Sequence, residues 1–234
     1  MLFRSTRQLI ENYSLSSNIQ IKHVWHPDEG FRRTLILNKA VTQSSGEYLI
    51  FLDGDCIVFP DFISRHAALA EAGYMVMGSR ILCSAAFTSR IENNKLWPCT
   101  FKFKEWLRSL AKNDINRIFP LLKLPDGLWR KLRTKKWLGI RTFNLAVWKN
   151  DFYAVNGFDE QFEGWGHEDA DLAIRLINNS ILRKDGQFAL PVLHLWHAEN
   201  DRSNEKENKN YLASSINSRK IKAIKGIINS KVNK

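Results

Sequence analysis

The sequence predicts an α/β fold, in which mostly parallel strands form a central sheet and helices flank it. Five consecutive apolar or aromatic residues, Tyr48–Leu52, are typical of a strand that is buried on both faces. A helical pattern over residues 61–72 follows, and then a second strand-like run, Tyr74–Met77. This alternation indicates a sheet with parallel strands. With 234 residues and 44% hydrophobic content, the chain can bury the core of one substantial domain or two small ones.

The segment before the central strand predicts two helices and one short strand. Residues 7–13 have a helical pattern and lead into a polar loop, and residues 21–25 predict the short strand. Residues 26–30 contain Pro, Asp and Gly and therefore predict a turn. Residues 31–41 carry apolar side chains at helical spacing, and Ser44-Ser45-Gly46 ends this helix directly before the central strand.

The residues after the central strand divide into a regular and an irregular part. Gly73 can end the helix over residues 61–72 in a left-handed conformation. Residues 80–137 predict an irregular insertion with amphipathic helices, in which basic and aromatic residues alternate over residues 101–108 and 128–133. This insertion is either a surface for an anionic membrane or a lipid-linked substrate, or a solvated basic face.

Polar residues become frequent again in the C-terminal third. Residues 141–147 predict a strand, and residues 156–159 predict a turn. Glu168 and Asp169 come just before an amphipathic helix over residues 172–177, in the region where the helix dipole favours ionised carboxylates. Two glycines on either side of Trp165 favour a shaped loop at this point, although the carboxylates can also be only a signal for the start of the helix.

The chain ends with a strand and a basic tail. Residues 188–192 predict the last strand, which leads to His194 and His197. From Ser215 onward the sequence predicts a frayed amphipathic helix or a disordered arm, and its lysines are Lys220, Lys222, Lys225, Lys231 and Lys234. We therefore expect one domain over residues 1–205 and a basic tail over residues 206–234.

The net charge of +11 and the pI near 9.7 imply an anionic partner. A nucleic acid, a phosphorylated ligand and an acidic membrane surface would all meet this requirement. The sequence contains no recognisable RNA-binding or DNA-binding module. A phosphate-rich substrate or a membrane explains the charge equally well, so we expect no nucleic-acid partner.

Cysteine content and hydropathy indicate the compartment. Cys56, Cys83 and Cys99 contain no CxxC pair, which argues against a disulfide framework or a zinc site and fits a reducing environment. The sequence has no apolar run of membrane-spanning length and no signal-peptide pattern at Met1. We expect a cytoplasmic protein, with peripheral contact to the inner face of the cell membrane.

Three polar clusters stand at the ends of predicted elements: Asp53 with Asp55, Glu168 with Asp169, and His194 with His197. Ligands of open α/β sheets bind at the carboxyl ends of strands. Asp-Gly-Asp there can hold a hard divalent cation, or it can simply be an acidic turn that caps the strand. A cation held by Asp55 and a histidine would neutralise a diphosphate leaving group, and a separate carboxylate would take a proton from an attacking hydroxyl.

These motifs resemble those of family 2 glycosyltransferases with the GT-A fold, a Rossmann-like fold. Leu52-Asp53-Gly54-Asp55 resembles the DxD motif, and residues 31–38 resemble a segment that lines the nucleotide. Asn156-Gly157-Phe158-Asp159-Glu160 precedes Gly164-Trp165-Gly166-His167-Glu168-Asp169, which is similar to the acceptor-site motif of β-1,4-galactosyltransferases. His194-Leu195-Trp196-His197 resembles the late segment that supplies a histidine to the metal. Together these segments cover roughly residues 20–205.

The resemblance implies specific roles for the metal-binding residues. Asp55 and His197 would ligate Mn²⁺ or Mg²⁺. Asp53 would touch the ribose of the nucleotide-sugar or join the metal shell. His194 stands where a weaker metal ligand can occur, and it can equally be a histidine packed at the end of a strand.

The resemblance also implies roles in transfer. Asp169 would be the general base, and Glu168 would hold acceptor hydroxyls. Trp165 would stack on a sugar ring, and Arg33 would contact the diphosphate or the uridine. The full expected set of substrate-binding residues is Phe31, Arg33, Asn38, Asp53, Asn144 and Trp165.

The chain departs from the family pattern at its start. Family members begin with a strand and a TYN-like turn, followed by a second strand that ends in acidic residues, and Met1 falls after both. Leu37 also stands where the family has an arginine before Asn38. We therefore expect an N-terminally truncated fold with impaired nucleotide binding.

The sequence thus predicts a metal-dependent inverting glycosyltransferase, which moves a sugar from a UDP-sugar to a saccharide of lipopolysaccharide or capsule. One alternative is a truncated, inactive remnant that binds only sugar or metal. Another is a phosphohydrolase with Asp53 as nucleophile, but the sequence shows no clear set of the Thr or Ser and Lys motifs that such enzymes use later in the chain.

Overall fold

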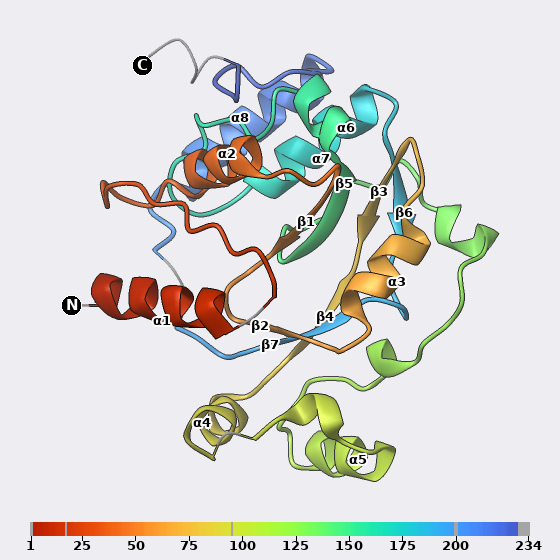
Figure 1. The fold of residues 1–234 in the computed structure, drawn as a ribbon. Coiled ribbons are helices and arrows are strands. Elements are labelled where there is room, and N and C mark those ends of the chain that lie inside the picture. The colour runs from red at the N-terminus through yellow and green to blue at the C-terminus, as the bar shows by residue number, and fades with distance from the viewer. Residues whose placement is uncertain (1, 17, 95, 199–200, 229–234) are drawn as a thin grey trace.

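Two β-sheets form the centre of the computed structural model, which describes residues 2–16, 18–94, 96–198 and 201–228 (Figure 1). The larger sheet has the strand order β1-β5-β3-β6, and the smaller sheet has the order β2-β7-β4. In chain order the strands are β1 (Tyr48–Leu52), β2 (Cys56–Val58), β3 (Tyr74–Met77), β4 (Ser79–Leu82), β5 (Asn144–Trp148), β6 (Leu182–Asp185) and β7 (Pro191–His194). The chain crosses from the larger sheet to the smaller one three times, from β1 to β2, from β3 to β4 and from β6 to β7.

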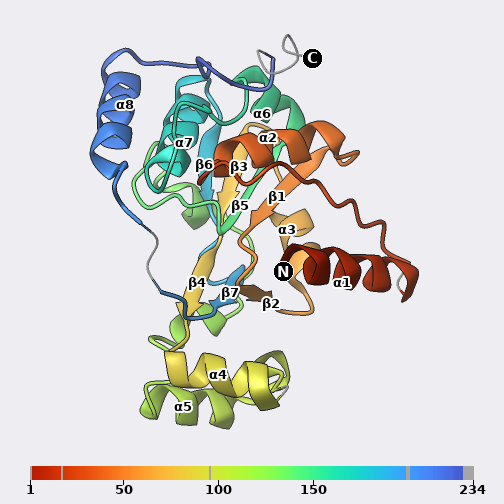
Figure 2. The ribbon, with the colours of Figure 1, turned by 90° about the vertical axis from the view of Figure 1, so that its left-hand side faces the viewer.

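Helices cover the larger sheet and extend beyond the smaller one. They are α1 (Leu2–Ser16), α2 (Arg33–Gln43), α3 (Phe62–Leu69), α4 (Ala85–Asn94), α5 (Phe103–Ala111), α6 (Lys149–Ala154), α7 (Glu168–Asn178) and α8 (Glu205–Asn217). The α2, α6, α7 and α8 helices gather at one end of the molecule, whereas α4 and α5 lie together at the opposite end (Figure 1, Figure 2). Three short 3₁₀ helices (Pro98–Thr100, Phe119–Leu121 and Leu128–Lys131) lie in the predicted insertion.

The predicted α/β class is confirmed, and in the larger sheet β1, β3 and β6 run in one direction while β5 runs against them. The β3/β6 and β4/β7 pairs are parallel, whereas the β1/β5, β3/β5 and β2/β7 pairs are antiparallel. The long insertion after β4 explains the reversal of β5, because it returns the chain to the edge of the larger sheet at which β1 and β3 end, where Asn144 pairs with Leu52 and Leu145 with Met77. There β5 enters between β1 and β3 with reversed direction. A short crossover helix would have kept the strands parallel.

The central strand is packed on both faces, as predicted. Leu49 and Phe51 belong to the main hydrophobic core, together with residues of α7 such as Leu172 and Leu176. Tyr48 and Ile50 pack against a second cluster around Val76 and Ala146. The strand is therefore held in place by packing on both faces. Asp53 and Asp55 follow directly after this rigid element.

The predicted helices α1, α2, α3 and α7 are present, while several short strands differ from the prediction. No strand forms over residues 21–25, where Ile21 and Trp25 are exposed. The last strand lies at Pro191–His194 instead of residues 188–192. The sequence did not indicate β2, β4 or β6, because runs of three or four residues carry too little periodicity to identify a strand.

The chain after α8 is packed onto the core instead of forming a free arm. Asp159 accepts hydrogen bonds from Lys220 Nζ at 2.6 Å and from the backbone N–H of Ile224 at 2.8 Å. Ala223 and Ile227 are buried. The expectation of a frayed helix or disordered arm is therefore wrong for residues 215–228. Lys231 and Lys234 lie outside the described residues.

The predicted insertion also contains an arginine that does not face solvent. Arg130 is buried, and its guanidinium donates to backbone carbonyls of Leu124, Pro125, Asp185 and Gln187. It therefore ties the insertion to the end of β6 and is not part of a basic surface. In the part of the chain that the structure describes, no helix combines the length and the apolar character needed to cross a membrane.

Candidate functional site

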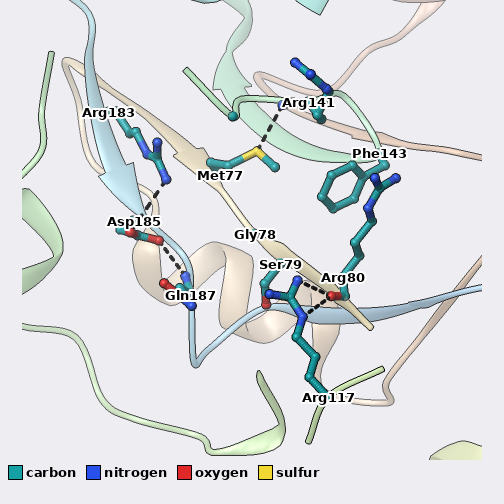
Figure 3. Close-up of a pocket in the computed structure, with 11 residues that line it drawn as sticks. Met77, Gly78, Ser79, Arg80, Arg117, Arg141, Phe143, Arg183, Asp185 and Gln187 are labelled. Atoms are coloured by element: carbon teal, nitrogen blue, oxygen red, sulfur yellow. Dashed lines mark hydrogen bonds and ion pairs between the residues drawn. The ribbon is translucent and has the colours of Figure 1, made fainter. Parts of the chain in front are cut away.

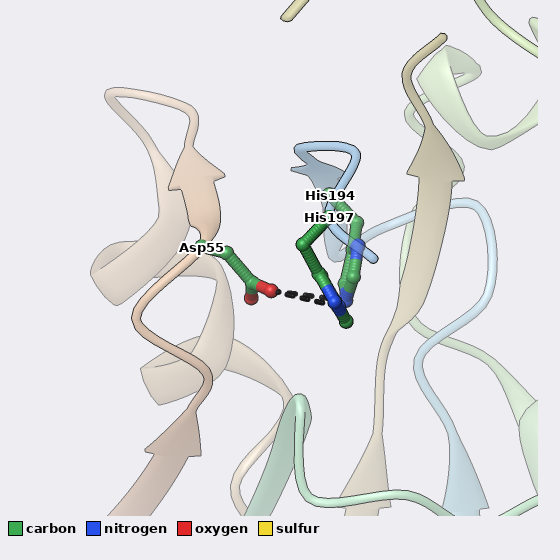
Figure 4. A group of neighbouring side chains, drawn as sticks. All are labelled: Asp55, His194 and His197. Carbon is green, nitrogen blue, oxygen red and sulfur yellow. Dashed lines mark ion pairs between the residues drawn. The ribbon is translucent and has the colours of Figure 1, made fainter. Parts of the chain in front are cut away.

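The pairing of β2 with β7 brings an aspartate and two histidines together (Figure 4). Cys56 lies directly opposite His194 in this antiparallel pair, and the N–H of Leu195 donates to the carbonyl of Asp55 at 2.9 Å. Asp55 is thus a cross-strand neighbour of the segment that contains His194 and His197. We call Asp55, His194 and His197 the metal cluster, and the register of β2 against β7 brings its residues together.

The ring nitrogens of both histidines point at one carboxylate oxygen. Asp55 Oδ2 lies 3.2 Å from His197 Nε2 and 3.7 Å from His194 Nε2. His194 Nδ1–H donates to the carbonyl of Leu195 at 2.9 Å, and His197 Nδ1–H donates to that of Ala198 at 2.7 Å. A carbonyl can only accept, so in the neutral rings each Nε2 carries a lone pair. Two lone pairs and a carboxylate therefore converge on one place.

This convergence fits a divalent cation. One ligand atom from each of the three residues lies within 4.8 Å of the other two. Metal-bound histidines usually donate their second ring N–H to a carbonyl, as both do here. A mixed set of imidazole and carboxylate ligands suits Mn²⁺ better than Mg²⁺, because Mg²⁺ prefers oxygen ligands throughout.

Asp53, the first carboxylate of the motif, belongs to a second cluster. Its Oδ1 accepts a hydrogen bond from Arg33 Nη2 at 2.5 Å. Arg33 Nη1 lies 3.3 Å from Asp169 Oδ1 and 3.4 Å from Glu168 Oε1. One guanidinium thus links three carboxylates from two different segments. We call Arg33, Asp53, Glu168 and Asp169 the arginine–carboxylate cluster.

Thr142 completes this second cluster, although no pattern in the sequence indicates it. Its hydroxyl donates to Asp169 Oδ1 at 2.6 Å and accepts from Arg33 Nη1 at 2.6 Å. Thr142 lies just before β5, so the antiparallel entry of that strand brings it to the start of α7. It therefore fixes the orientation of the Asp169 carboxylate.

Burial and charge make Glu168 unusual. Desolvation raises the pKa of Glu168 to about 7, and the neighbouring Asp169 carboxylate adds to this rise, while Arg33 opposes it. The carboxylates of Asp53, Glu168 and Asp169 in turn change the pKa of Arg33. They raise the pKa of the Arg33 guanidinium even though its burial acts to lower it. The cluster therefore holds a permanent cation beside a carboxyl group that titrates near neutral pH.

A strained loop delivers the two carboxylates to the first turn of α7. Gly164, Gly166 and His167 all have positive φ angles (72°, 109° and 72°), a conformation that costs least for glycine. The loop is anchored at Gly164, whose N–H donates to the carbonyl of Phe31 at 3.0 Å. Asn208 of α8 also donates to the carbonyl of Trp165 at 3.3 Å. The prediction of a shaped loop before the helix is confirmed.

Trp165 and Phe31 remain available at the surface of the site. The Arg202 guanidinium lies 4.4 Å from the centre of the Trp165 ring, close enough for a cation–π contact. Phe31 has an exposed side chain, and its backbone holds the Gly164 loop. Both positions are compatible with the expected substrate contacts.

Two expected substrate-binding residues have structural roles instead. Asn38 is buried, and its amide both donates to the carbonyl of Phe158 and accepts from the N–H of Phe158. Asn144 is fully buried, donates to the carbonyl of Leu190 and accepts from His66 Nε2 at 3.0 Å. Neither side chain can reach a ligand, so the expectation for Asn38 and Asn144 is wrong. Buried polar groups keep such partners because losing them costs free energy.

Comparison with protein families gives two matches along the chain. The model described as glycosyl transferase family 2 matches residues 4–123, which contain Arg33, Asp53 and Asp55. The model described as N-terminal domain of galactosyltransferase matches residues 131–185, which contain the loop before α7 and both of its carboxylates.

Two curated relatives are named validoxylamine A glucosyltransferase, from Streptomyces hygroscopicus subsp. jinggangensis (strain 5008) and from Streptomyces hygroscopicus subsp. limoneus. Each is 28% identical to this chain over 182 residues, or 74% of the chain. The aligned part spans 41% and 38% of these proteins, so the chain corresponds to about two fifths of their length.

A solved structure confirms the fold. The crystal structure of GalNAc-T7 with UDP, GalNAc and Mn²⁺ superimposes with a TM-score of 0.52 and 13% sequence identity. The match covers 91% of this chain and 41% of that one. At 13% identity such a likeness bears on the fold alone, and it confirms the predicted GT-A fold.

Proposed function

The chain belongs to glycosyl transferase family 2, and we propose from this that it transfers a sugar from a nucleotide-sugar to a saccharide acceptor. The donor is a UDP-sugar, and the acceptor is a saccharide of lipopolysaccharide or capsule. The observation that carries the proposal is the presence of a cation-binding cluster and a buried carboxylate cluster at the two ends of Asp53-Gly54-Asp55.

The donor side of the reaction belongs to the metal cluster. Asp55, His194 and His197 would hold Mn²⁺, which neutralises the negative charge of the diphosphate leaving group. Arg33, the first residue of α2, adds a fixed positive charge beside Asp53. These residues place positive charge where the leaving group develops negative charge.

The acceptor side belongs to the carboxylates of α7. The acceptor hydroxyl oxygen forms a bond to the anomeric carbon while the bond from that carbon to the diphosphate breaks. The hydroxyl proton passes to Asp169, and UDP leaves. Asp169 Oδ1 is occupied by Thr142 and Arg33, so Oδ2 is the oxygen that we assign to the proton.

Glu168 has a different role, because its pKa is about 7. Near neutral pH it is present in both its protonated and its ionised form. It can therefore donate a hydrogen bond to an acceptor oxygen or accept one from a hydroxyl. Trp165 completes the acceptor site by contact with a sugar ring, held in place by Arg202.

Membrane contact is the second part of the proposal. Several large apolar side chains on and after α5 are exposed, namely Phe103, Leu107, Phe119, Leu128 and Leu132. Basic residues such as Lys102, Lys104 and Arg133 lie beside them in the sequence. This combination suits an anionic bilayer surface, to which each basic residue contributes about 1 kcal/mol.

Flotation with vesicles tests the membrane contact. We expect recovery with vesicles that contain phosphatidylglycerol and little recovery with phosphatidylcholine alone. Leu128→Gln with Leu132→Gln should reduce the recovery, because both side chains are among the most exposed of this group. Equal recovery with both lipids would rule out the contact.

Release of UDP from a panel of UDP-hexoses, with Mn²⁺ and a saccharide acceptor, tests the transfer. Asp169→Asn should lower kcat by about 10²–10⁴-fold, the usual contribution of a general base. Binding of UDP and Mn²⁺ should persist in this variant. Asp151→Asn in α6 is the matched control and should retain its activity. Near-normal kcat in Asp169→Asn would move the role of base to Glu168.

A further inference from the structure

A cavity of about 380 Å³ lies where the chain passes from β3 to β4, and its wall contains four arginines (Figure 3). They are Arg80, Arg117, Arg141 and Arg183, and they come from four separate segments of the chain. The lining contains one carboxylate, Asp185. Four guanidinium groups and one carboxylate leave an excess of three positive charges around this cavity. We call it the arginine pocket.

Neutral groups hold most of these arginines in place. Arg117 donates through Nε and Nη2 to the carbonyl of Arg80, at 3.0 and 2.5 Å. The Arg80 guanidinium lies 4.8 Å from the centre of the Phe143 ring. Asp185 is 3.6 Å from Arg183 Nη2, and it also accepts from the N–H of Gln187 at 2.9 Å. Arg183 is thus paired with Asp185, whereas the carbonyl and ring contacts of Arg117 and Arg80 orient their guanidinium groups through neutral partners.

Two features of the pocket favour an anionic occupant. Burial lowers the pKa of the Arg80 guanidinium, and the positive charges of Arg141 and Arg117 act in the same direction, while Cys56 and Asp53 oppose the shift. Two buried polar atoms of the lining, Ser79 Oγ and Arg183 Nε, have no hydrogen-bond partner within the described residues. Buried polar atoms normally have partners, and an occupant with acceptor oxygens would offer one to each of these two donors.

The arginine pocket is directly next to the two clusters of the site. In the segment before β5, Arg141 and Phe143 line the pocket, while Thr142 between them bonds to Asp169. The charge of Arg141 also acts on Glu168. One stretch of extended chain therefore separates the pocket from the carboxylates of α7.

The strand register places the pocket on the same face of the smaller sheet as the metal cluster. Leu82 pairs with His194, and Arg80 precedes Leu82 by two residues, so Arg80 and His194 point to one face. Ile57, Ile81 and Leu193 point to the other face and pack toward α4 and α5. The pocket and the metal cluster thus share one face of the smaller sheet.

We propose that the arginine pocket binds a phosphate-type oxyanion carried by the acceptor saccharide. The planar guanidinium forks of arginine match phosphate oxygens in pairs, and the unpaired hydroxyl of Ser79 can donate to a further oxygen. The donor's own diphosphate is met by the metal cluster. The assignment to the acceptor rests on the proposed transfer, because Asp169, which lies beyond Thr142, takes the proton of the acceptor hydroxyl. The acceptor is therefore an anionic saccharide, such as a sugar phosphate.

Calorimetric titration of the full chain with glucose 6-phosphate and with glucose tests this proposal at low ionic strength. We expect the phosphorylated sugar to bind and the neutral sugar not to bind. The variant with both Arg80→Gln and Arg141→Gln should lose affinity for glucose 6-phosphate by about tenfold or more. Its affinity for UDP in the presence of Mn²⁺ should stay within about twofold of the original chain.

Arg108→Gln on the exposed face of α5 is the matched control for the change in net charge, and it should leave both affinities unchanged. If the double variant does not fold, Arg141→Gln alone serves, because Arg141 is exposed. Retention of glucose 6-phosphate binding in the variants, or its absence in the original chain, would overturn the proposal. So would a parallel loss of UDP affinity, since the pocket would then hold the donor's diphosphate. A failure of the transferase proposal would instead show as absent UDP release with sugar-phosphate binding intact.

Discussion

The metal cluster lies near solvent, whereas the arginine–carboxylate cluster is largely buried. In the metal cluster the side chains of His197 and Asp55 are 46% and 32% exposed and that of His194 is 10% exposed. In the arginine–carboxylate cluster those of Glu168, Asp169 and Arg33 are 10%, 11% and 22% exposed and that of Asp53 is 32% exposed. A single strand pairing builds the first cluster, while four separate segments meet in the second. Charges in the first cluster are solvated and cost little free energy. Charges in the second are desolvated, so their balance affects the stability of the fold.

The largest effect on stability should come from removing the cation of the buried cluster. Arg33→Met leaves Asp53, Glu168 and Asp169 close together with no positive charge between them. We expect the free energy of unfolding to fall by about 2–4 kcal/mol, because breaking one side of a buried ion pair leaves uncompensated charge. Urea denaturation at pH 7.5 measures this difference.

The neighbouring arginine provides the control for that measurement. Arg32 pairs with Glu29 at 2.7 Å, but both side chains are well exposed. Arg32→Met should therefore change the free energy of unfolding by less than about 0.5 kcal/mol. Similar losses in both variants would show that the Arg33 cluster is not the desolvated site described above.

A smaller effect, of opposite sign, is expected for Glu168→Gln. Between about pH 4.5 and pH 7 the folded chain keeps a proton on Glu168 that the unfolded chain has released. The stability contribution of Glu168 therefore falls as pH rises through this window, by on the order of 2 kcal/mol, and is constant above it. Glu168→Gln removes this dependence, so the variant should be more stable than the original chain at pH 8.

Thermal unfolding from pH 4.5 to pH 8 compares the two chains. The difference in stability between Glu168→Gln and the original chain should be smallest at pH 4.5 and should grow toward pH 7. A difference that is independent of pH would show that Glu168 has an ordinary pKa in the folded chain. Because this residue is also proposed to contact the acceptor, the gain in stability should accompany a loss of acceptor affinity.

The smallest effect on stability is expected in the metal cluster. Asp55→Asn in metal-free buffer should change the free energy of unfolding by less than about 0.5 kcal/mol, since exposed ion pairs contribute little. Chemical denaturation with chelator present measures this value. A loss above about 2 kcal/mol would mean that Asp55 supports the fold as strongly as a buried residue does.

The Asp-Gly-Asp turn and the start of α7 could be predicted from the sequence because both follow local rules. An apolar run that ends in Asp53-Gly54-Asp55 and a helix that starts with Glu168-Asp169 are local patterns. The direction of β5 could not be predicted in this way. It depends on the path of residues 80–137, which have no clear periodicity.

Features that depend on several segments were not predictable. Asn38 and Asn144 look like ligand-binding amides in the sequence, but their burial and their partners Phe158, Leu190 and His66 appear only in the folded chain. The arginine pocket has the same origin, because its four arginines are widely separated in the sequence. The hydrogen bonds between Asp159 and the segment after α8 likewise appear only in the folded chain.

The contrast between a solvated metal cluster and a buried carboxylate cluster is tested most directly by titrating Mn²⁺ into the chain and three variants by calorimetry. We expect one Mn²⁺ to bind per chain, with binding weakened at least about tenfold in Asp55→Ala and in His197→Ala. Asp169→Asn should bind Mn²⁺ like the original chain, because its carboxylate belongs to the other cluster. Unchanged Mn²⁺ affinity in both Asp55→Ala and His197→Ala, or its loss in Asp169→Asn, would contradict the assignment of the cation to Asp55, His194 and His197.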